Sequence, residues 1–578
     1  MKRRHELEIH PRFRLVDSCA AEFAAVTPYY YATYEGGSAP TGIDHVPGID
    51  DFTKQRIVVV GSGPIRIGQG IEFDYGCVHA VGAIRELGHE AIIINNNPET
   101  VSTDFDTSDR LYFDPLTLEH SAEILLREKA HGILLQFGGQ TAINLALPLA
   151  GRLPHLEGMG LNLAMQGTTP DAVDEASDRE RFEAFAKRVG LRMPNGTTAS
   201  TPEGVREAVQ DIGYPVLIRP SYVLGGRGME ILSNNRQLDA YMEEAFLSPD
   251  RPLLVDENLG NAIELDVDAV CDGSEVLIGA IMEHLEEAGI HSGDSTCFIP
   301  PQNVSKKVLA QVEDWTRKIG IQLGVKGCFN IQYAIRGETL YVLEVNPRGS
   351  RTFPFVAKAT GVPLARIAAR LTMGEKLADL DFPEPQSEAV CVKAPVFPFI
   401  KLRGLDPAPG PEMKSTGEVM GSHKRAAAAY LKARLATEIP VPTEGGVYIT
   451  VKNADKHDVI PLAQELEEMG FTIYATRGTA HVLRDSGGIN VQTCYRITEG
   501  LTPDALDLMR QGKIQLIINT PRSTGGAVLD GNMMRRLAVE LNIPFVTTMA
   551  GASMEVQAIA EAKEGMPEPR LLDIAILN

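Results

Sequence analysis

Residues able to bind a metal ion and a phosphoryl group are concentrated in the stretch YVLEVNPRGSRT, residues 341–352. In a β-strand successive side chains alternate between faces, so Glu344 and Asn346 would share one face. A carboxylate and an amide oxygen suit Mg²⁺, which takes a few protein oxygens and leaves room for phosphate oxygens. Arg348 and Arg351 follow directly and offer planar donors to a phosphoryl group. On the residues alone, a polar pair on a strand surface is the commoner use of this pattern.

A partner strand for this stretch is FNIQYAI, residues 329–335, separated from it by a Gly-Glu turn at 337–338. The spacing predicts an antiparallel hairpin. That pairing would bring Gln332 onto the face that carries Glu344 and Asn346, and so add a second amide oxygen to the candidate metal site.

A second candidate for phosphate binding is VLIRPSYVLGGRGMEI, residues 216–231. Arg219 closes an apolar strand, and the loop Gly225-Gly226-Arg227-Gly228 precedes another strand. A glycine-rich hairpin can fold its backbone over phosphates without obstruction by side chains. A flexible surface hairpin with no ligand explains the same composition equally well.

Residues downstream offer contacts to the rest of a nucleotide. The stretch LLVDENLGNAIELDVDAV places Glu257, Leu259 and Glu264 where a strand passes into a loop. Acids there could hold an amino group or ribose hydroxyls, although acids in loops are more often solvated. His291, within EEAGIHSGDS, is either a phosphate or acid–base contact or a hydrogen-bonded turn residue.

The glycine turn in VVVGSGPIRIGQGIEFDY, residues 58–75, resembles the glycine-rich turn of a dinucleotide-binding site. That fingerprint requires GxGxxG at the start of a helix and an acidic residue at the end of the next strand. Arg66 stands where the third glycine belongs, and the next strand ends in Asn95-Asn96-Asn97. Both criteria fail, which excludes an NAD site. The glycines either expose backbone N–H groups beside a helix start or form a tight turn without a ligand.

Length, charge and cysteine content narrow the class of protein. A chain of 578 residues has room for three or four domains of about 100–200 residues. Its net charge of −21 argues against broad binding to nucleic acid, but a locally positive pocket could still bind an anion. The seven cysteines lack CxxC spacing, and neither a secretory signal nor an apolar run of about 20 residues is present. We therefore expect a cytoplasmic protein with no membrane partner.

The chain divides into units that differ in their pattern. From Arg56 to about residue 165, β-branched runs alternate with helical patterns, which predicts a parallel sheet of βα units. Mixed α and β segments fill 166–400, and a connector with Pro and Gly fills 401–440. From 441 to 578 the alternation resumes in a second, smaller parallel sheet. An aromatic head, 1–36, and a turn-rich linker, 37–55, come first.

Together these stretches closely resemble the C-terminal half of carbamoyl phosphate synthetase large subunits. The resemblance covers nearly the whole chain, in the order GPIRIGQGIEFDY, NNNPETVSTDFDTSDRLYF, QFGGQT, DRERF, RPSYVLGGR, HSGDS, EVNPR, FVAKATG and STGEVMG. It implies an α/β and α+β multidomain fold: a Rossmann-like pre-ATP-grasp domain at 56–165, an ATP-grasp domain at 166–400 and a methylglyoxal-synthase-like regulatory domain at 441–578. The head, 1–36, resembles the end of the family's oligomerisation domain.

The family makes carbamoyl phosphate, for pyrimidine and arginine synthesis, from bicarbonate, an ammonia source and two ATP. The half present here implies a ligase step in which carbamate attacks the γ-phosphate of the second ATP, a transfer that depends on positioning and charge neutralisation. The resemblance implies ATP contacts from Arg179, Arg219 and Gly226 at the phosphates, Glu257 and Leu259 at adenine, and Glu264 at ribose.

The remaining site residues also come from the resemblance. Gln332, Glu344 and Asn346 would hold Mg²⁺ or Mn²⁺, and K⁺ is a further candidate cation. His291, Arg348 and Arg351 would surround the transferred phosphoryl group. Glu72 and Glu99 match residues that line the route by which carbamate reaches this site.

The C-terminal region resembles the family's regulatory domain, which binds an effector, a nucleotide or ornithine. The matching positions are Thr450, Lys456, Thr476, Thr479, Arg496, Asn519 and Thr520. Two residues depart from a well-known pattern, because Arg496 stands where lysine is found and Pro521 replaces a threonine. The charge survives, but one hydroxyl and one N–H are lost.

The family's large subunit has two homologous halves, and this sequence matches one of them. Because the sequence begins with its own methionine, we expect a naturally split, oligomeric synthetase. Its partners would be a first-half chain and a glutamine amidotransferase small subunit. The alternatives are a fragment, a regulatory subunit without independent activity, and another ATP-grasp ligase that joins a carboxylate to an amine.

Overall fold

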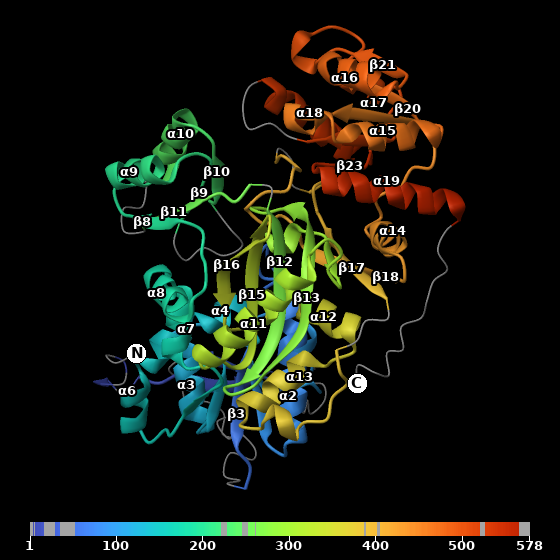
Figure 1. Ribbon diagram of the computed structural model, residues 1–578. Helices are drawn as coiled ribbons and strands as arrows, with labels where there is room; N and C mark the ends of the chain where they lie inside the picture. The colour runs from blue at the N-terminus through green and yellow to red at the C-terminus, as the bar shows by residue number, and fades with distance from the viewer. Residues whose placement is uncertain are drawn as a thin grey trace.

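The computed structural model describes residues 4, 6–7, 9–16, 29–34, 53–220, 228–245, 252–260, 262–385, 389–401, 405–520 and 526–565. Within these residues the strands form four sheets, two of seven strands, one of four and one of five. In Figure 1 the first unit lies at the bottom, the antiparallel strands of the second cross the centre, and the C-terminal unit lies above them.

The first sheet has the strand order β1-β2-β5-β4-β3-β6-β7, and all neighbours from β2 to β7 are parallel. This confirms the parallel sheet predicted for this region. All five residues of β3 are buried, as expected for a central strand that is covered on both faces. The strands are β1 (Arg12–Leu15), β2 (Tyr29–Thr33), β3 (Arg56–Val60), β4 (Glu90–Ile94), β5 (Arg110–Tyr112), β6 (Gly132–Leu134) and β7 (Ala164–Gln166).

Helices accompany this sheet, and the head of the chain extends it. The helices are α2 (Glu72–Glu86), α3 (Leu118–Glu128), α4 (Gly139–Ile143), α5 (Ala146–Ala150) and α6 (Leu153–Gly158), with a 3₁₀ turn η1 (Val101–Thr103). Strands β1 and β2 lie in the head and continue the sheet beyond β5. Of the predicted linker, residues 37–52 lie outside the described residues.

The second unit contains two antiparallel sheets. The smaller has the order β10-β9-β11-β8, and the larger β16-β15-β12-β13-β14-β17-β18. The smaller sheet contains β8 (Gly196–Ala199), β9 (Val216–Pro220), β10 (Glu230–Leu232) and β11 (Leu253–Glu257), next to α9 (Pro202–Ile212) and α10 (Asn235–Ala245). The larger contains β12 (Ile263–Asp272), β13 (Val276–Glu287), β14 (Cys297–Ile299), β15 (Lys326–Arg336), β16 (Thr339–Asn346), β17 (Val390–Val396) and β18 (Gly417–His423).

Strand β18 lies within the segment predicted as a connector, so the larger sheet extends past residue 400. The remaining helices of this part are α7 (Pro170–Ser177), α8 (Arg179–Val189), α11 (Lys306–Gln322), α12 (Phe353–Thr360), α13 (Leu364–Thr372) and α14 (Ala426–Ala436), with 3₁₀ turns η2 (Ser292–Asp294) and η3 (Leu377–Asp379).

The C-terminal sheet has the order β21-β20-β19-β22-β23, with parallel neighbours throughout. This confirms the second parallel sheet. Its elements are β19 (Gly446–Thr450), η4 (Asn453–Lys456), α15 (Val459–Glu468), β20 (Thr472–Thr476), α16 (Arg477–Gly487), β21 (Val491–Cys494), η5 (Ile497–Glu499), α17 (Ala505–Arg510), β22 (Leu516–Asn519), α18 (Gly526–Glu540), β23 (Phe545–Val546) and α19 (Met549–Glu564).

Shared apolar cores join the three units. One core combines Ile57 and Ile84 of the first unit with Val356 and Ala368, on the helices that follow β16. Another combines strands β14 and β17 with α14 and, through Ala558, with α19. Burial of this kind holds neighbouring units in a defined arrangement.

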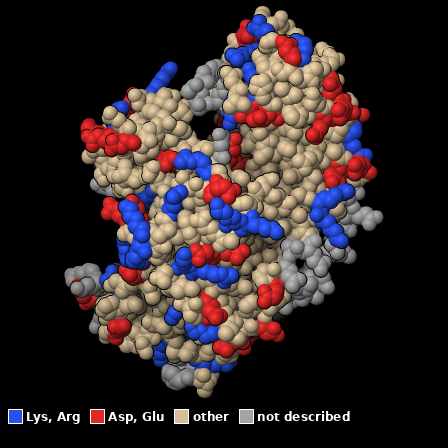
Figure 2. Space-filling view, viewed as in Figure 1, with Lys and Arg blue, Asp and Glu red and all other residues tan. Residues whose placement is uncertain are grey.

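The surface of the molecule carries charged groups of both signs. On the face shown in Figure 2, basic and acidic side chains are interspersed, and a hollow separates the lobe of α9 and α10 from the C-terminal unit. Within the described part of the chain, no helix combines the length and the apolar character needed to cross a membrane.

Candidate functional site

The hairpin of β15 and β16 builds the centre of the site. Gln332 pairs with Glu344 and Asn330 with Asn346, in antiparallel register. This confirms the predicted hairpin, and directly opposed residues share a face. The Nδ2 atom of Asn346 donates a hydrogen bond to Oε1 of Glu344 at 2.9 Å. Glu344 keeps 40% of its side chain exposed, so a carboxylate oxygen faces solvent beside two amides.

Two arginines follow the hairpin, of which Arg351 is buried and Arg348 is half-buried. Arg348 donates to Oδ1 of Asn346 and to Oε1 of Gln140, both at 3.0 Å. Burial lowers the pKa of Arg348 from its usual value. Arg351 donates from Nη2 to Oε1 of Glu72 at 2.8 Å, with side chains 9% and 5% exposed. A fixed, desolvated guanidinium pair is suited to binding an anion in one geometry.

His291 begins the turn that packs against Arg351. Its Nδ1 accepts a hydrogen bond from the backbone N–H of Gly293 at 3.0 Å. Burial, helped by the charge of Arg351, lowers the pKa of His291 to about 4. The ring is therefore neutral at pH 7, and because Nδ1 is an acceptor the proton resides on Nε2. A Cβ on Gly293 would lie 2.7 Å from Nη1 of Arg351, so a larger residue here would displace the guanidinium from its present position.

A second pair of arginines shares one acidic partner, Asp256. Arg179, the first residue of α8, forms an ion pair with Asp256 at 2.8 Å. Arg219, on β9, lies 3.6 Å from Asp256 and 4.0 Å from Glu344. Asp256 thus links the two arginines that the sequence predicts at phosphates. Sequence reasoning missed Asp256, although it stands directly before the predicted Glu257.

Of the residues predicted to contact the nucleoside, one is half-buried and two are buried. Glu257, the last residue of β11, forms an ion pair with Arg336 at 2.9 Å. Leu259 is 4% exposed and packs in a small apolar cluster. Glu264 is buried, and its burial raises its pKa to about 7. The predicted Gly226 lies outside the described residues.

A buried carboxylate that sequence reasoning also missed anchors the arginine loop. Asp268 accepts hydrogen bonds from Ser350 at 2.7 Å, from Thr352 at 2.6 Å and from Asn330 at 2.9 Å. Burial raises the pKa of Asp268 to about 7. Because Ser350 and Thr352 flank Arg351, these bonds fix the backbone from which that arginine extends.

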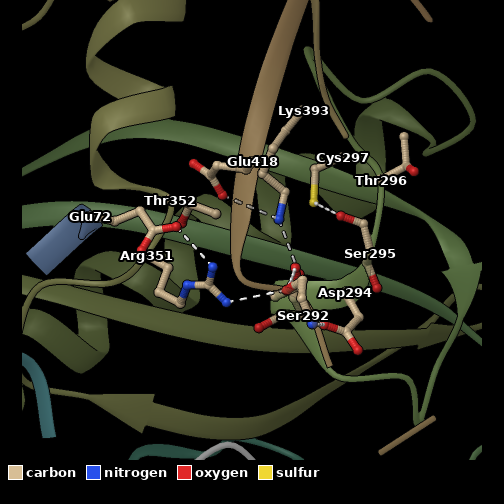
Figure 3. Close-up of polar contacts among 12 residues, drawn as sticks. Glu72, Ser292, Asp294, Ser295, Thr296, Cys297, Arg351, Thr352, Lys393 and Glu418 are labelled. Carbon is tan, nitrogen blue, oxygen red and sulfur yellow. Dashed lines mark hydrogen bonds and ion pairs between the residues drawn. The ribbon is translucent and has the colours of Figure 1, made fainter. Parts of the chain in front are cut away.

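A second ion pair, Lys393 with Glu418, lies next to the turn that contacts Arg351. In Figure 3, Lys393 and Glu418 point toward each other beside the Ser292 turn, and Arg351 lies between that turn and Glu72. The Nζ atom of Lys393 donates to the backbone oxygen of Ser292 at 3.2 Å and lies 3.8 Å from Glu418. The alternating positive and negative groups stabilise one another where water is excluded.

The seven C-terminal residues predicted to bind an effector line one pocket, which we call the C-terminal pocket. Its cavity volume is about 60 Å³, and the pocket is partly open to solvent. Its other lining residues include Lys452, Gly478, Asp530 and Gly531. Pro521, the predicted departure next to Thr520, lies outside the described residues.

The position of this pocket follows from the topology of the sheet. Thr450, Thr476 and Asn519 are the last residues of β19, β20 and β22, so the pocket opens at the carboxyl ends of parallel strands. Helix α16 begins directly after Thr476, and Lys456 Nζ lies 3.1 Å from where a Cβ on Gly478 would be. A helix N-terminus and an amine at one spot attract an anion.

The glycine turn of the first unit is filled by its own chain. A Cβ on Gly61 would lie 2.5 Å from the side chain of Asn95, and the N–H of Gly63 donates to Oδ1 of Asn95 at 3.0 Å. The asparagine that replaces the expected acid therefore occupies the turn. This geometry agrees with the exclusion of an NAD site.

Comparison with known proteins decides the family. Residues 53–175 match the carbamoyl phosphate synthase preATP-grasp domain, 178–380 the carbamoyl-phosphate synthase L chain ATP binding domain, and 458–547 the MGS-like domain. The chain is 49% identical to the carbamoyl phosphate synthase large chain, C-terminal section, of Methanocaldococcus jannaschii, over 97% of this chain and 91% of that protein. The chain belongs to the carbamoyl phosphate synthase large chain family.

Full-length members of the family are about twice as long. The large chain of Methanosarcina acetivorans is 49% identical over 97% of this chain but over only 51% of its own length. The chain therefore spans about half the length of the first curated relatives it matches. Among solved structures, the ADP complex of N5-carboxyaminoimidazole ribonucleotide synthetase aligns with a TM-score of 0.51 at 13% identity, over 66% of this chain and 96% of that one. This likeness shows the ATP-grasp fold alone.

The two residues predicted to line the carbamate route, Glu72 and Glu99, are placed differently by the structure. Glu72 lies buried against Arg351. Glu99 is exposed in the turn before η1, where its N–H donates to Oδ1 of Asn97. The structure therefore brings Glu72, but not Glu99, into contact with Arg351.

The hairpin also fits a divalent cation. Among the described residues, no group of three or more His, Cys, Asp or Glu is arranged as a metal site. The set Gln332, Glu344 and Asn346 instead offers one carboxylate and two amides, which is the incomplete oxygen set that Mg²⁺ completes with phosphate oxygens and water.

Proposed function

We propose that the chain phosphorylates carbamate with ATP, as the second-half component of a carbamoyl phosphate synthase. The observation that carries this proposal is the convergence of three groups of residues on one site. The hairpin carboxylate Glu344 and the arginines Arg348 and Arg351 lie within eight residues of one another, and the neutral His291 reaches Arg351 from the turn after β13. Family membership supports the reaction, and the arrangement of these residues supports the roles proposed for them.

In the proposed step a carbamate oxygen attacks the γ-phosphorus. The bond from that phosphorus to the oxygen bridging to the β-phosphate breaks, and its electron pair leaves with ADP. Arg348 and Arg351 neutralise charge on the transferred group without reorganisation, because both are already fixed. His291 donates one hydrogen bond from Nε2 to a phosphoryl oxygen and carries no charge at pH 7. No proton transfer is required.

The remaining residues bind and orient ATP. Arg179 and Arg219 would contact its phosphates, together with the loop at Gly226, while Glu257, Leu259 and Glu264 would surround the nucleoside. Gln332, Glu344 and Asn346 would hold Mg²⁺, or Mn²⁺ on the same oxygens. When bound, the cation shields the phosphate charges that would otherwise repel the incoming carbamate.

The deciding experiment is the reverse reaction, formation of ATP from ADP and carbamoyl phosphate with Mg²⁺. It bypasses both the unstable carbamate and the bicarbonate step. Wild-type chain should form ATP, and Glu344→Gln should lower the rate by about 100-fold or more. Glu338→Gln is the matched control, because Glu338 lies in the turn of the same hairpin and is 62% exposed. If folded wild-type protein binds ADP but forms no ATP, the proposal that this chain carries out phosphoryl transfer without partner chains would be wrong.

We further propose that a first-half chain and a glutamine amidotransferase subunit complete the synthase, since the chain spans half of its relatives. The units 56–165, 166–400 and 441–578 are proposed as its domains. Addition of the separately purified first-half chain should give carbamoyl phosphate from bicarbonate and ammonia. The C-terminal pocket is proposed as the site of an anionic effector.

A further inference from the structure

The guanidinium of Arg348 is held by hydrogen bonds from all three of its nitrogen atoms. Nη1 donates to the backbone oxygen of Gly349 and Nη2 to Oδ1 of Asn346, both at 3.0 Å. Nε donates at 3.0 Å to Oε1 of Gln140, which lies 208 positions earlier in the chain. Within the described residues these bonds use three of the five N–H groups, which leaves one N–H on each Nη for two oxygens of a phosphoryl group.

The acceptor of the Nε bond belongs to residues 136–140, which we call the amide segment. This segment follows β6 of the first unit and includes the start of α4. It also holds the backbone on both sides of Arg348. Nε2 of Gln136 donates to the backbone oxygen of Pro347 at 3.0 Å, and the N–H of Gly349 donates to the backbone oxygen of Gln136 at 2.9 Å. The arginine side chain and the residues that flank it therefore all bind to one segment of the first unit.

The amide segment is itself fixed within the first unit. A Cβ on Gly138 would lie 2.3 Å from the backbone oxygen of Val60, so any larger residue would have to displace the backbone. Nε2 of Gln69, which is 1% exposed, donates to the backbone oxygen of Gly138 at 2.8 Å. Nε2 of Gln140 donates to Oδ1 of Asn144 at 2.8 Å. Contacts that do not involve the arginine thus direct the Oε1 atom of Gln140.

Helix α2 of the first unit adds two further contacts to the arginines. The guanidinium carbon of Arg348 lies 5.9 Å from the centre of the Phe73 ring, a distance at which the face of an aromatic ring attracts a cation. Arg351 donates to Glu72, the first residue of the same helix. Each arginine proposed at the phosphoryl group therefore has a partner in the first unit, although both arginines follow β16.

The bond to Gln140 differs from the other two bonds of Arg348 in what it fixes. Asn346 and Gly349 belong to the same loop as the arginine, so bonds to them move with that loop. Oδ1 of Asn346 is also proposed for Mg²⁺, so it has a second use in the same site. Gln140 belongs to another unit, and its bond holds the guanidinium relative to that unit. Donors that are fixed before the reaction stabilise developing charge without reorganisation.

We propose that Gln140 is a positioning residue for phosphoryl transfer, which fixes the guanidinium of Arg348 so that its two remaining N–H groups face the transferred group. This inference rests on the proposed function of the site, which it extends by assigning part of the phosphoryl-binding geometry to the first unit. Such a role predicts a loss of kcat and an unchanged affinity for ADP, because Arg348 is proposed to act on the transferred group and not on ADP.

The test compares Gln140→Leu with wild type, in the whole chain and in the reverse reaction. Gln140→Leu removes the acceptor and keeps most of the side-chain volume, so kcat should fall about 10- to 30-fold. The affinity for ADP, measured by calorimetry, and the circular dichroism spectrum should not change. Gln140→Glu restores an acceptor oxygen and should bring kcat back to within about threefold of wild type. Asn144→Ala is the matched control, because it removes the other hydrogen bond of Gln140, and it should leave kcat unchanged.

Two further measurements separate positioning from a general loss of structure. In the double variant Gln140→Leu with Arg348→Met, kcat should equal that of Arg348→Met alone, because Gln140 acts only through the arginine. In protein labelled with ¹⁵N in its arginines, the Nε–H signal of Arg348 is assigned by its absence from Arg348→Met. This proton should exchange with solvent at least about tenfold faster in Gln140→Leu than in wild type, because its acceptor is lost.

Four results would overturn the proposal. They are an unchanged kcat in Gln140→Leu, equal losses of kcat in Gln140→Leu and Asn144→Ala, additive losses in the double variant, and unchanged exchange of the Arg348 Nε–H. The exchange measurement does not depend on catalysis. A wild-type chain that forms no ATP would therefore contradict the proposed function, and the exchange rate would then decide by itself whether Gln140 fixes Arg348.

Discussion

The two candidate ligand sites hold their charges in opposite ways. At the hairpin site, Arg351 is paired with Glu72 and Arg179 with Asp256, and these side chains are 12% exposed or less. In the C-terminal pocket, Arg496 is exposed, and Lys452 is 30% exposed and lies between two acids. One site has its cations fixed before a ligand arrives, and the other leaves them able to exchange partners.

This difference matches the functions proposed for the two sites. Phosphoryl transfer benefits from charges that need no reorganisation during the reaction. A regulatory anion acts only if its binding changes existing contacts, because a ligand shifts an equilibrium by its differential interactions. Forming a buried ion pair costs desolvation energy, and removing one member strongly destabilises the protein because the other charge stays buried without a partner. An exposed ion pair contributes little to stability.

The largest expected difference is in stability. Arg351→Met leaves the carboxylate of Glu72 buried without its partner, and we expect a loss of about 3–5 kcal/mol of unfolding free energy. Arg496→Met removes an exposed cation and should change stability by less than about 0.5 kcal/mol. Urea unfolding checks both, with Trp315 fluorescence reporting the large antiparallel sheet and circular dichroism the whole chain. Equal losses would show that the two arginines are held alike.

Ligand affinity should separate the sites next. Lys456→Gln should weaken binding of inorganic phosphate about tenfold, the usual effect of a lost charged hydrogen bond. The affinity for ADP should not change. Arg219→Gln should show the reverse pattern. Calorimetry with each ligand gives the four values, and a change of both affinities by either variant would mean that the pockets are not independent binding sites.

Local patterns made much of the fold predictable. The strand alternation and Gly-Glu turn predicted the β15–β16 hairpin with Gln332 opposite Glu344, and βα alternation predicted both parallel sheets. In the C-terminal unit the seven residues came from the family resemblance. They lie at the ends of β19, β20 and β22 or in the segments that follow the parallel strands, so one topology gathers all of them. Features that depend on residues close together in the sequence, or on the end of a strand in a parallel sheet, could be predicted from the sequence.

Contacts between side chains of different units could not be predicted from the sequence. Arg351 and Glu72 are 279 positions apart, and Asp406 and Arg535 are 129 apart. No periodicity specifies such pairs, because they depend on how the shared cores dock one unit on another. The strands β1 and β2 show the same limit, since nothing in the aromatic run near Tyr30 indicated the sheet that it joins.

A smaller effect concerns pH. Burial raises the pKa of Glu264 to about 7, so this carboxyl is neutral at pH 6 and ionised at pH 8. An ionised carboxylate accepts stronger hydrogen bonds from ribose hydroxyls than a neutral acid does, and ADP affinity should rise about fivefold from pH 6 to 8. Glu264→Gln should flatten the profile. A wild-type profile that is already flat would place the ribose elsewhere.

The smallest expected effect tests whether neutral donors contribute to the C-terminal pocket. Thr479 is 2% exposed and lies in the first turn of α16, beside the lining residue Thr476. Thr479→Val keeps its shape but removes the hydroxyl, and phosphate affinity should fall about threefold. Thr472→Val, at the exposed start of the same β20 strand, is the matched control and should change nothing. If Thr479→Val also changes nothing, the exposed cations alone bind the anion, and the contrast with the pre-paired arginines of the active site becomes sharper.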